Sequence, residues 1–315
     1  MNNPICIYHG GCADGFTAAW AVWRALGDIE FYPGVYGEAP PDVTGRDVIM
    51  VDFSYKRPVI DAMAATCRTM LILDHHKTAE ADLSGLPLPV GMGPTGPAPA
   101  DWGVVEVISG YNPDLMADWT RTCNAPAAVY AIFDLTRSGA QIAWDFFHPG
   151  QPRPTLIEYV ADRDLWRFEM PFSRQVSAYI HSWPMEFKRW DIISIKLAGG
   201  ELDFQDVFLS GGAILRQHDK NVASLIKTTR REMVIGGHTM PVANVPHFMA
   251  SDAGHSMAKG HPFSATYYDR EGARVFSLRS TADGADVAAI AAQYGGGGHR
   301  NSAGFQAPQN WEGDQ

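Results

Sequence analysis

The sequence predicts an α/β protein with an amino-terminal domain built on a parallel sheet and a smaller carboxyl-terminal α/β domain. Short apolar runs that end in Asp or His alternate with helical segments between residues 5 and 77, and a second series of apolar runs follows residue 236. The length of 315 residues also exceeds that of most single domains. We therefore predict domains at 1–210 and 236–315, joined by a helical linker at 211–235.

The first predicted strand, Ile5–Tyr8, leads into a glycine-rich turn at His9–Gly15. A helix is predicted over Phe16–Leu26, because Ala and Trp fill this segment and a glycine follows it as a stop. The order of strand, turn and helix places His9 and Asp14 at the carboxyl end of the first strand.

Two further predicted strands end in the same way. Val48–Val51 is followed directly by Asp52, and Pro58–Ala65 is predicted as a helix with a proline in its first turn. Met70–Leu73 is the next strand, and it is followed by Asp74-His75-His76-Lys77. Because right-handed crossovers place parallel strands side by side, the three strand ends are expected to meet at one edge of the sheet.

Carboxylate and imidazole groups that meet at one sheet edge predict a site for divalent cations. These groups suit Mn²⁺, Mg²⁺ or Zn²⁺, and the Lys77 ammonium group can meet an anion bound there. An Asp-His-His triplet occurs often by chance, and a single Asp at a strand end is commonly a helix cap. The prediction therefore depends on His9, Asp14, Asp52 and the triplet lying together, since a carboxylate can bridge two cations.

Composition and charge disfavour several other classes of protein. The chain is 46% hydrophobic, and its first residues do not resemble a signal peptide. It has no apolar run of the roughly eighteen residues that a membrane span needs, and its four cysteines show no Cys-x-x-Cys spacing. We therefore expect a cytoplasmic protein without membrane contact. A formal charge of −10 disfavours a basic groove for long nucleic acid, but a small phosphorylated substrate can bind through cations.

The region after the triplet has weaker patterns. Proline and glycine dominate residues 83–103, which predicts an irregular loop, and the apolar spacing over Pro126–Phe147 predicts a helix. The apolar segment Leu156–Val160 leads to two carboxylates, Asp162 and Asp164. Residues 184–212 support no specific prediction.

The carboxyl-terminal region begins with a helix predicted over Ala213–Arg231. The later strands are Met240–Val245, Phe263–Tyr268 and Arg274–Leu278, followed by a helix at Val287–Tyr294 and then Gly295–Gly298 with His299. A glycine run is commonly a linker, but its N–H groups can also form an anion nest beside His299. Arg279 offers a planar fork for a phosphate or carboxylate, although an Arg at a strand end is as commonly a surface residue.

These motifs together resemble those of DHH-family phosphoesterases with a carboxyl-terminal DHHA1 domain, a group that includes RecJ-like exonucleases, oligoribonucleases and phosphodiesterases of small nucleotides. The matching segments occur in the family's order over nearly the whole chain. They are His9–Gly15, Val51-Asp52, Asp74-His75-His76, the Asp162 region, Leu278-Arg279-Ser280, Gly295–His299 and Ala303-Gly304-Phe305. The resemblance implies an active site in the cleft between the two domains.

The resemblance also implies a metal-ligand set. One cation would be held by Asp14, Asp52, His75 and Asp162, and Asp52 would bridge to a second cation held partly by His9. Asp162 fits the family's segment through its first residue, with Asp164 as the alternative. Of the two divalent cations implied, Mn²⁺ is the first choice, and Mg²⁺ and Zn²⁺ are alternatives.

Catalysis and substrate binding are assigned by the same resemblance. The catalytic residues would be His76, Asp74 and Arg279, with His76 facing the scissile phosphate or its leaving group. The substrate-binding residues would be Lys77, Arg279, Ser280, Gly296, Gly297, Gly298 and His299.

Cys12 departs from the family's pattern, because it occupies a position where a carboxylate ligand of the first metal is expected. A thiolate would favour Zn²⁺ over Mg²⁺. A weak first site that fills only with substrate, or a small buried residue behind the site, are equal alternatives for this position.

The reaction implied is hydrolysis of phosphodiester bonds in short oligonucleotides or small nucleotides by a water that the cations activate. Two alternatives stay open. One is a phosphomonoesterase or polyphosphate hydrolase that uses the same metals, and the other is a non-catalytic nucleotide-binding protein with a degenerate first metal site. The sequence leaves open RNA against DNA, cleavage polarity and the oligomeric state, a homodimer included.

Overall fold

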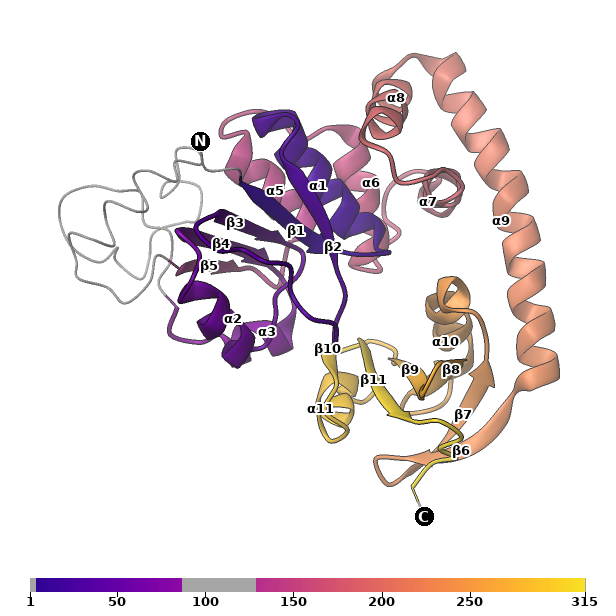
Figure 1. Cartoon of the computed structure of the whole chain (residues 1–315). Coiled ribbons are helices and arrows are strands. Elements are labelled where there is room, and N and C mark those ends of the chain that lie inside the picture. The colour runs from indigo at the N-terminus through magenta and orange to yellow at the C-terminus, as the bar shows by residue number, and fades with distance from the viewer. Residues whose placement is uncertain (1–3, 87–128, 315) are drawn as a thin grey trace. The chain divides into compact units, whose positions relative to one another are not determined.

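The computed structural model describes residues 4–86 and 129–314 (Figure 1). The chain divides into two compact units, Met1–Ile214 (unit 1) and Leu215–Gln315 (unit 2), and each has a sheet and a buried core of its own. The predicted class is confirmed, with a parallel sheet in the amino-terminal unit and a smaller α/β unit after it. Most of the predicted 83–103 loop, and Cys123, lie outside the described residues.

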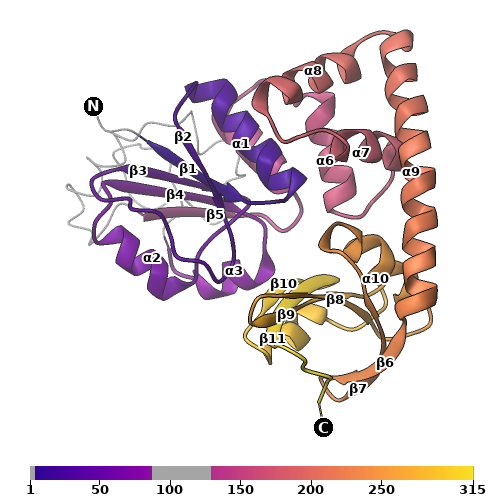
Figure 2. The ribbon, with the colours of Figure 1, turned by 45° about the vertical axis from the view of Figure 1, so that its right-hand side comes forward.

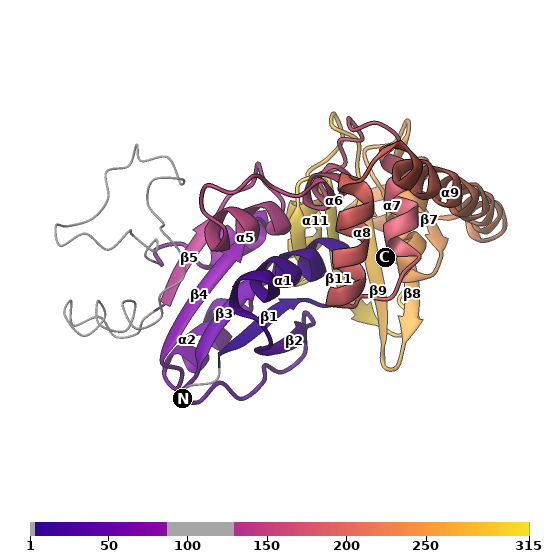
Figure 3. The same cartoon turned by 90° about the horizontal axis from the view of Figure 1, so that it is seen from above.

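Within the described residues, unit 1 contains a five-stranded sheet in the order β2-β1-β3-β4-β5, and every neighbouring pair is parallel (Figure 3). The strands are β1 (Ile5–His9), β2 (Glu30–Gly34), β3 (Asp47–Val51), β4 (Thr69–Asp74) and β5 (Val129–Phe133). The three predicted strands correspond to β1, β3 and β4, which are adjacent in the sheet. Their continuous apolar runs reflect burial on both faces.

Helices cover both faces of this sheet, and alternate residues of a strand belong to different cores. Ile49 and Val51 of β3 join the core beneath α1 (Ala13–Leu26) and α5 (Gly139–Phe147). Val48 and Met50 join the opposite core, which includes the buried residues of α2 (Arg57–Ala64). The same side of the sheet as α2 carries the short helix α3 (Lys77–Asp82), as Figure 1 shows.

The helix predicted over Pro126–Phe147 is wrong in its first half. Val129–Phe133 is strand β5, paired with β4, and a helix begins only at Gly139. Ser138 caps α5 in a capping box with Gln141, which fixes the start of the helix. A short apolar run has the same appearance in a buried strand and in a buried helix, so its pairing with β4 decided the structure. Residues 126–128 lie outside the described part of the chain.

The remaining helices of unit 1 include the segment that carried no prediction. They are α6 (Thr155–Asp164), α7 (Ser173–His181), α8 (Phe187–Ala198) and the first part of α9 (Glu201–Thr229). The helix predicted over Ala213–Arg231 is the second half of α9, which is drawn as one long helix in Figure 2. The predicted end was wrong, because α9 stops at Thr229 and Arg231 begins a strand. The two units divide inside this helix, between Ile214 and Leu215.

Unit 2, over its described residues, contains a six-stranded sheet in the order β10-β11-β9-β8-β7-β6. Only the β7–β8 pair is parallel. The strands are β6 (Arg231–Ile235), β7 (His238–Asn244), β8 (Ser264–Arg270), β9 (Ala273–Arg279), β10 (Gly297–His299) and β11 (Ser302–Pro308). α11 (Val287–Ala292) contributes to one core, whereas α10 (Ala250–Ala258) and Val222 of α9 contribute to another.

The glycine run is part of a hairpin and not a linker. Gly297 and Gly298 lie in β10 opposite Gly304 and Ala303 of β11. A Cβ atom at Gly296 would lie 2.1 Å from the Gly304 carbonyl oxygen, so close backbone packing requires glycine there.

Among the described helices, none combines the length and the apolar character that a membrane-spanning helix needs. Cys6, Cys12 and Cys67 are free thiols, which agrees with the absence of a disulfide framework over this part of the chain.

Candidate metal centre

The carboxyl ends of β1, β3 and β4 lie at one edge of the unit 1 sheet. Tyr8 is opposite Val51, and Val51 is opposite Leu73, so the next residues of the three strands come together at this edge. These next residues are His9, Asp52 and Asp74. The convergence predicted from the three strand ends is therefore present in the structure.

Asp52 is the centre of this group. Its Oδ1 lies 2.9 Å from His75 Nε2, and its Oδ2 lies 3.4 Å from His9 Nδ1. The residue has a φ of 54°, in the left-handed region that few residues other than glycine adopt. Asp52 therefore occupies a strained backbone position in which its carboxylate lies between two imidazole rings.

The carboxylate of Asp52 is buried without adequate partners. The side chain is 1% exposed, and neither oxygen has a properly oriented hydrogen bond among the described residues, despite the close approach of His75. The same holds for Nδ1 of His9. A buried polar atom without a partner is costly, and a bound divalent cation would satisfy all three atoms. The donor set thus fits the metal that the sequence predicts.

Asp14 is held by the amino terminus of α5. Its Oδ2 accepts a hydrogen bond of 2.6 Å from the Gly139 N–H, and its Oδ1 accepts one of 3.2 Å from the Ala140 N–H. These N–H groups belong to the first turn of a helix and have no partner within it, so a carboxylate is favoured at this point. The helix orients Asp14 toward His75, whose Nε2 lies 3.8 Å from Asp14 Oδ2.

Two glycines permit this close packing. A Cβ atom at Gly139 would lie 2.4 Å from the Cβ of Asp52, and a Cβ atom at Gly15 would lie 2.5 Å from the carbonyl oxygen of His9. Gly139 could not be predicted as a site residue from the sequence, because a Ser-Gly pair before a helix indicates only a helix start. Gly139 matters because it packs against Asp52, which lies 87 positions earlier in the chain.

Side chains of unit 1 that could hold a metal ion form overlapping groups, in each of which the candidate ligand atoms lie within 4.8 Å of one another. His9, Cys12 and Asp52 form one group, and Asp14, His75 and Asp164 form a second. Asp52 and His75 join the two groups, since their side chains are in contact at 2.9 Å. Cys12 therefore lies within ligand distance of His9 and Asp52, at the position that the resemblance assigns to a carboxylate.

Asp162, which the resemblance favoured over Asp164, is committed to the protein backbone. Its Oδ1 accepts from the Glu169 N–H at 2.9 Å, and its Oδ2 accepts from the Met170 N–H at 3.3 Å. Asp164 Oδ2 instead lies 3.6 Å from His75 Nε2. Both residues are on α6, but two positions along a helix point in different directions. The geometry thus brings Asp164, the alternative, into the cluster.

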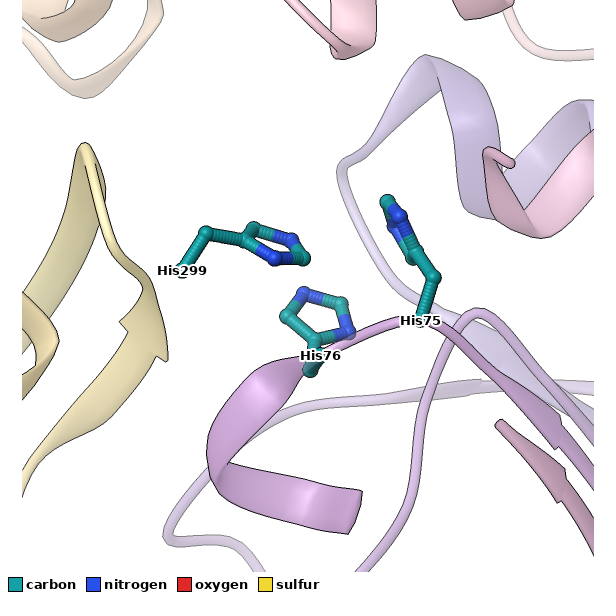
Figure 4. A group of neighbouring side chains, drawn as sticks. All are labelled: His75, His76 and His299. Carbon is teal, nitrogen blue, oxygen red and sulfur yellow. The ribbon is translucent and has the colours of Figure 1, made fainter. Parts of the chain in front are cut away.

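Asp74 fixes the position of His76. It is fully buried, and its Oδ1 lies 2.7 Å from His76 Nδ1 while its Oδ2 accepts from the Ser54 hydroxyl at 3.1 Å. His75 and His76 follow it between the end of β4 and the start of α3, as Figure 4 shows. Asp74 therefore acts through His76 by favouring the tautomer with a proton on Nδ1.

Burial and neighbouring charges shift the pKa values in the cluster. Burial opposes ionisation of Asp52, but His75 and His9 outweigh it and hold the pKa of Asp52 well below its usual range. Burial, with Asp164 and Asp52 nearby, raises the pKa of Asp14 well above its usual range. Burial lowers the pKa of His75, but the three carboxylates around it raise the pKa well above the ordinary value. Such mutual perturbation is typical of a functional site.

The Cys12 thiol shows the same effect. Burial and then the neighbouring carboxylates Asp52, Asp164 and Asp14 raise its pKa well above the ordinary value. Cys12 is therefore a neutral thiol in the metal-free protein, and only a cation would favour the thiolate.

Tyr36 is a second residue that the sequence analysis missed. It lies after β2, and its ring makes edge-on contacts with the rings of His9 at 5.3 Å and His76 at 6.2 Å between centroids. β2 was not predicted, because its sequence, Glu-Phe-Tyr-Pro-Gly, contains a proline and has no continuous apolar run. Its pairing with β1 brings Tyr36 to the site.

The predicted substrate residues of unit 2 lie close together within that unit. Arg279 donates to the Leu278 carbonyl at 2.8 Å and to the Ser251 hydroxyl at 2.9 Å, while the Ser280 hydroxyl accepts from Asn301 at 2.8 Å. Gly296 donates its N–H to the Ala291 carbonyl at 2.9 Å, so this amide is not available to an anion. Gly297, Gly298 and His299 make up β10.

Comparison with known proteins gives one relative of similar sequence. No family model matches the chain. The chain is 26% identical over 334 aligned positions to the uncharacterized protein R106 of Acanthamoeba polyphaga mimivirus. This alignment covers 96% of the chain but only 66% of the relative, so the chain spans a part of that protein's length.

Several solved structures are similar to the chain at low identity. The DHH domain of a member of the s1p family of ribosomal proteins has a TM-score of 0.48 at 12% identity, and the match covers 97% of this chain and 83% of that one. The pGpG-specific phosphodiesterase PggH from Vibrio cholerae has a TM-score of 0.43 at 12% identity, with 97% of this chain and 94% of that one covered. RecJ in complex with Mn²⁺ from Thermus thermophilus has a TM-score of 0.42 at 14% identity, with 96% of this chain and 49% of that one covered. Each TM-score is below 0.5, so these structures do not establish the activity of this chain.

Proposed function

We propose that the protein is a metal-dependent phosphoesterase of the DHH type, which hydrolyses phosphodiester bonds in short oligonucleotides or small nucleotides. The observation that carries this proposal is the buried carboxylate of Asp52, which lies between two histidines and lacks a hydrogen-bond partner among the described residues. The Asp52 carboxylate lies at the sheet edge with further acidic and imidazole side chains, and together they provide the kinds of ligand that a two-cation site needs.

The two groups of ligands suggest two positions for cations. Asp14, His75 and Asp164 would hold one cation, and His9 with Cys12 would hold the other. Asp52 contacts a histidine of each group, so it is the carboxylate suited to bridge the pair. Oxygen and imidazole ligands favour Mn²⁺, while the thiol of Cys12 gives the second position some preference for Zn²⁺.

When bound, two divalent cations lower the pKa of an attacking water and neutralise charge that develops on a phosphoryl group. The protein's own residues position the proton transfers. His76 carries a proton on Nδ1, held by Asp74, and this leaves Nε2 as the nitrogen that can exchange a proton with a leaving oxygen. We assign this role to His76 and a positioning role to Asp74.

The small-substrate assignment is supported by charge. The formal charge of −10 disfavours a long basic channel, which single-stranded nucleic acid usually needs. The far end of the substrate is proposed to bind to unit 2, through Arg279, Ser280, Gly297, Gly298 and His299. Lys77, at the start of α3, is proposed to meet a substrate phosphate.

A hydrolysis assay tests the proposal. Protein supplied with Mn²⁺ is offered a labelled dinucleotide, a longer single strand, a cyclic dinucleotide and 3′-phosphoadenosine phosphate. We expect release of mononucleotide from the dinucleotide, and loss of this activity in Asp52→Ala. Asp47→Asn is a matched control, because Asp47 is buried at the opposite end of the same strand and pairs with Arg68 and Thr69.

Other outcomes would point to the alternatives. Release of phosphate from the monoester, without cleavage of any diester, would indicate a phosphomonoesterase. Failure on every substrate, with ligand affinity unchanged in Asp52→Ala, would indicate a non-catalytic nucleotide-binding protein, for which Cys12 in place of a carboxylate is the supporting observation.

A further inference from the structure

The two groups of candidate metal ligands in unit 1 differ in one kind of donor atom. The group that contains His75 offers only carboxylate oxygens and imidazole nitrogens, whereas the group of His9, Cys12 and Asp52 also offers a sulfur. Carboxylate oxygens suit harder cations such as Mn²⁺ and Mg²⁺, while a thiolate favours softer ones such as Zn²⁺. The two proposed cation positions are therefore chemically unlike.

The sulfur of Cys12 lies close to buried atoms that lack partners. In its group the three candidate ligand atoms, one from each side chain, lie within 4.8 Å of one another. Neither oxygen of the Asp52 side chain, which is 1% exposed, has a hydrogen-bond partner among the described residues, and Nδ1 of His9 has none either. Zn²⁺ binds nitrogen, oxygen and sulfur ligands at about 2.0–2.3 Å, so small side-chain rotations would bring all three atoms to one ion.

The backbone places Cys12 in a setting that is common for metal-binding cysteines. Cys12 is the N-cap residue of α1, so it lies at the end of the helix where N–H groups face outward and negative charge is stabilised. Thiolates that act as ligands are often found at such helix ends. The side chain is also only partly buried, so a cation can reach the sulfur.

The other two described cysteines are not placed for this role. Cys6 is fully buried in β1 and belongs to the core beneath α1. Cys67 precedes β4, at the end of that strand opposite to His75, and it packs against the core on the other side of the sheet. Cys67 is a partly buried free thiol like Cys12, but it is outside the candidate ligand groups of the described residues. It therefore provides a matched control.

We infer that Cys12 binds the second cation directly through its sulfur. The centre then holds two different cations, a softer one such as Zn²⁺ beside Cys12 and a harder one such as Mn²⁺ beside Asp14 and Asp164. On binding, the S–H bond breaks, its proton passes to water and the sulfur donates an electron pair to the cation. The inference rests on the proposed function and makes it more specific, because it names the kind of cation at each position.

Cobalt tests the bond between sulfur and metal without a measurement of activity. Co²⁺ commonly takes the place of Zn²⁺, and a thiolate bound to Co²⁺ gives a strong charge-transfer absorption in the near ultraviolet that oxygen and nitrogen ligands do not give. The full chain is freed of metal with a chelator, kept reduced and titrated with Co²⁺. We expect this absorption in the wild type and in Cys67→Ser, and we expect its loss in Cys12→Ser and Cys12→Asp.

A competition experiment tests the choice of cation. Protein loaded with Mn²⁺ is titrated with Zn²⁺, and the Mn²⁺ set free is followed by electron paramagnetic resonance. Zn²⁺ binds most sites more tightly than Mn²⁺, so the informative quantity is the difference between the two positions. We expect one Mn²⁺ to leave at a Zn²⁺ concentration at least about tenfold lower than the other. Cys12→Asp, which supplies the carboxylate expected from the resemblance, should remove this difference, and Cys67→Ser should keep it.

The possible results separate the two proposals. If Co²⁺ binds without the near-ultraviolet absorption, if Cys12→Ser keeps the absorption, or if both Mn²⁺ ions leave the wild type together, the inference is wrong while the phosphoesterase proposal stands. If neither Co²⁺ nor Mn²⁺ binds to the chain, both proposals are overturned. Thermal unfolding identifies a variant that fails to fold, and Cys12→Ser and Cys12→Asp can each replace the other in the cobalt experiment.

Discussion

The sheet edge at β3 and the loop after α6 both contain a buried aspartate, and the two differ in what satisfies the carboxylate. Asp52 is 1% exposed, with no hydrogen-bond partner for either oxygen among the described residues. Asp162 is 5% exposed, and both of its oxygens accept N–H groups of the following loop. Both carboxylates are thus buried, but only the Asp162 carboxylate is held by N–H groups of the loop that follows it.

This difference shows how a metal ligand can be told apart from a structural aspartate. Backbone N–H donors alone do not separate the two kinds, because Asp14 accepts two of them and its Oδ2 still lies 3.8 Å from His75 Nε2. The Asp52 carboxylate lies between His75 and His9, which outweigh burial and hold its pKa well below the usual range, so it stays ionised and suited to a cation. We therefore expect Asp52 to bind a cation and Asp162 to stabilise the fold, and each expectation can be tested.

The largest effect is expected from Asp52→Asn. This change neutralises the carboxylate that lies 2.9 Å from His75 Nε2 and 3.4 Å from His9 Nδ1, so it should lower hydrolysis by about a thousandfold, equivalent to several kcal/mol of charge stabilisation. Mn²⁺ content, measured by mass spectrometry of the metal after dialysis, should fall with it. Asp47→Asn should lose stability but keep its Mn²⁺, and retained activity in Asp52→Asn would contradict the assignment.

The second prediction compares the two aspartates of α6. Asp164→Asn should weaken Mn²⁺ binding at least about tenfold with little change in stability, because it removes a group near His75. Asp162→Asn should do the reverse, with a loss of about 1–3 kcal/mol in the free energy of unfolding, since its charged acceptor is removed from two N–H groups. Calorimetric titration with Mn²⁺ and urea unfolding measure the two effects. The opposite pattern would restore Asp162 as the ligand.

The third prediction concerns Gly139. In Gly139→Ala the new methyl group would lie 2.4 Å from the Cβ of Asp52, so we expect a loss of about 1–3 kcal/mol of stability together with weaker Mn²⁺ binding. Gly200→Ala is the control, because a Cβ atom there meets nothing within 4 Å, and it should cost less than about 1 kcal/mol. Equal effects of the two changes on Mn²⁺ affinity would show that the contact between Gly139 and Asp52 is unimportant.

The smallest effect is a pH dependence of the metal-free protein. The pKa of His75 is raised, so its stabilising charge is complete below the ordinary value of about 6.5 and is lost as the pH rises through the folded-state pKa. The raised pKa of Asp14 acts in the same direction, while the lowered pKa of Asp52 matters only in acid. We therefore expect Tm to fall by a few degrees from about pH 6.5 to about pH 8.5.

Mn²⁺ should suppress this dependence, because the cation replaces the lost positive charge among the carboxylates. His75→Asn should flatten the slope in the metal-free protein. A Tm that rises over the same interval in the absence of metal would contradict the sign of the effect. Differential scanning calorimetry at matched ionic strength measures each case.

The strand ends could be read from the sequence because the pattern is local. A continuous apolar run followed at once by Asp or His predicted β1, β3 and β4, and the crossover rule placed His9, Asp52 and Asp74 at one edge. The glycine stop of α1 and the proline at the start of α2 are local features as well. The location of the candidate metal centre in unit 1 was predicted from these elements alone.

The errors arose where the deciding contact is distant in sequence. Val129–Phe133 was predicted as helix, because a short apolar run does not reveal whether a strand will pair with it. The strand β2, with Tyr36 after it, has a weak pattern and forms through its pairing with β1. Propensity is a weak guide in such segments, since tertiary pairing outweighs it.

The sequence by itself determined the parallel α/β class, the three converging strand ends and the chemical type of the donors, because each depends on residues that are neighbours in the chain. Only the tertiary structure placed Asp164 beside His75 and Asp162 against backbone N–H groups, and showed that Gly139 must lack a side chain. Whether a carboxylate is satisfied depends on which N–H groups the fold brings to it. That is a property of packing between distant segments, which a linear pattern does not contain.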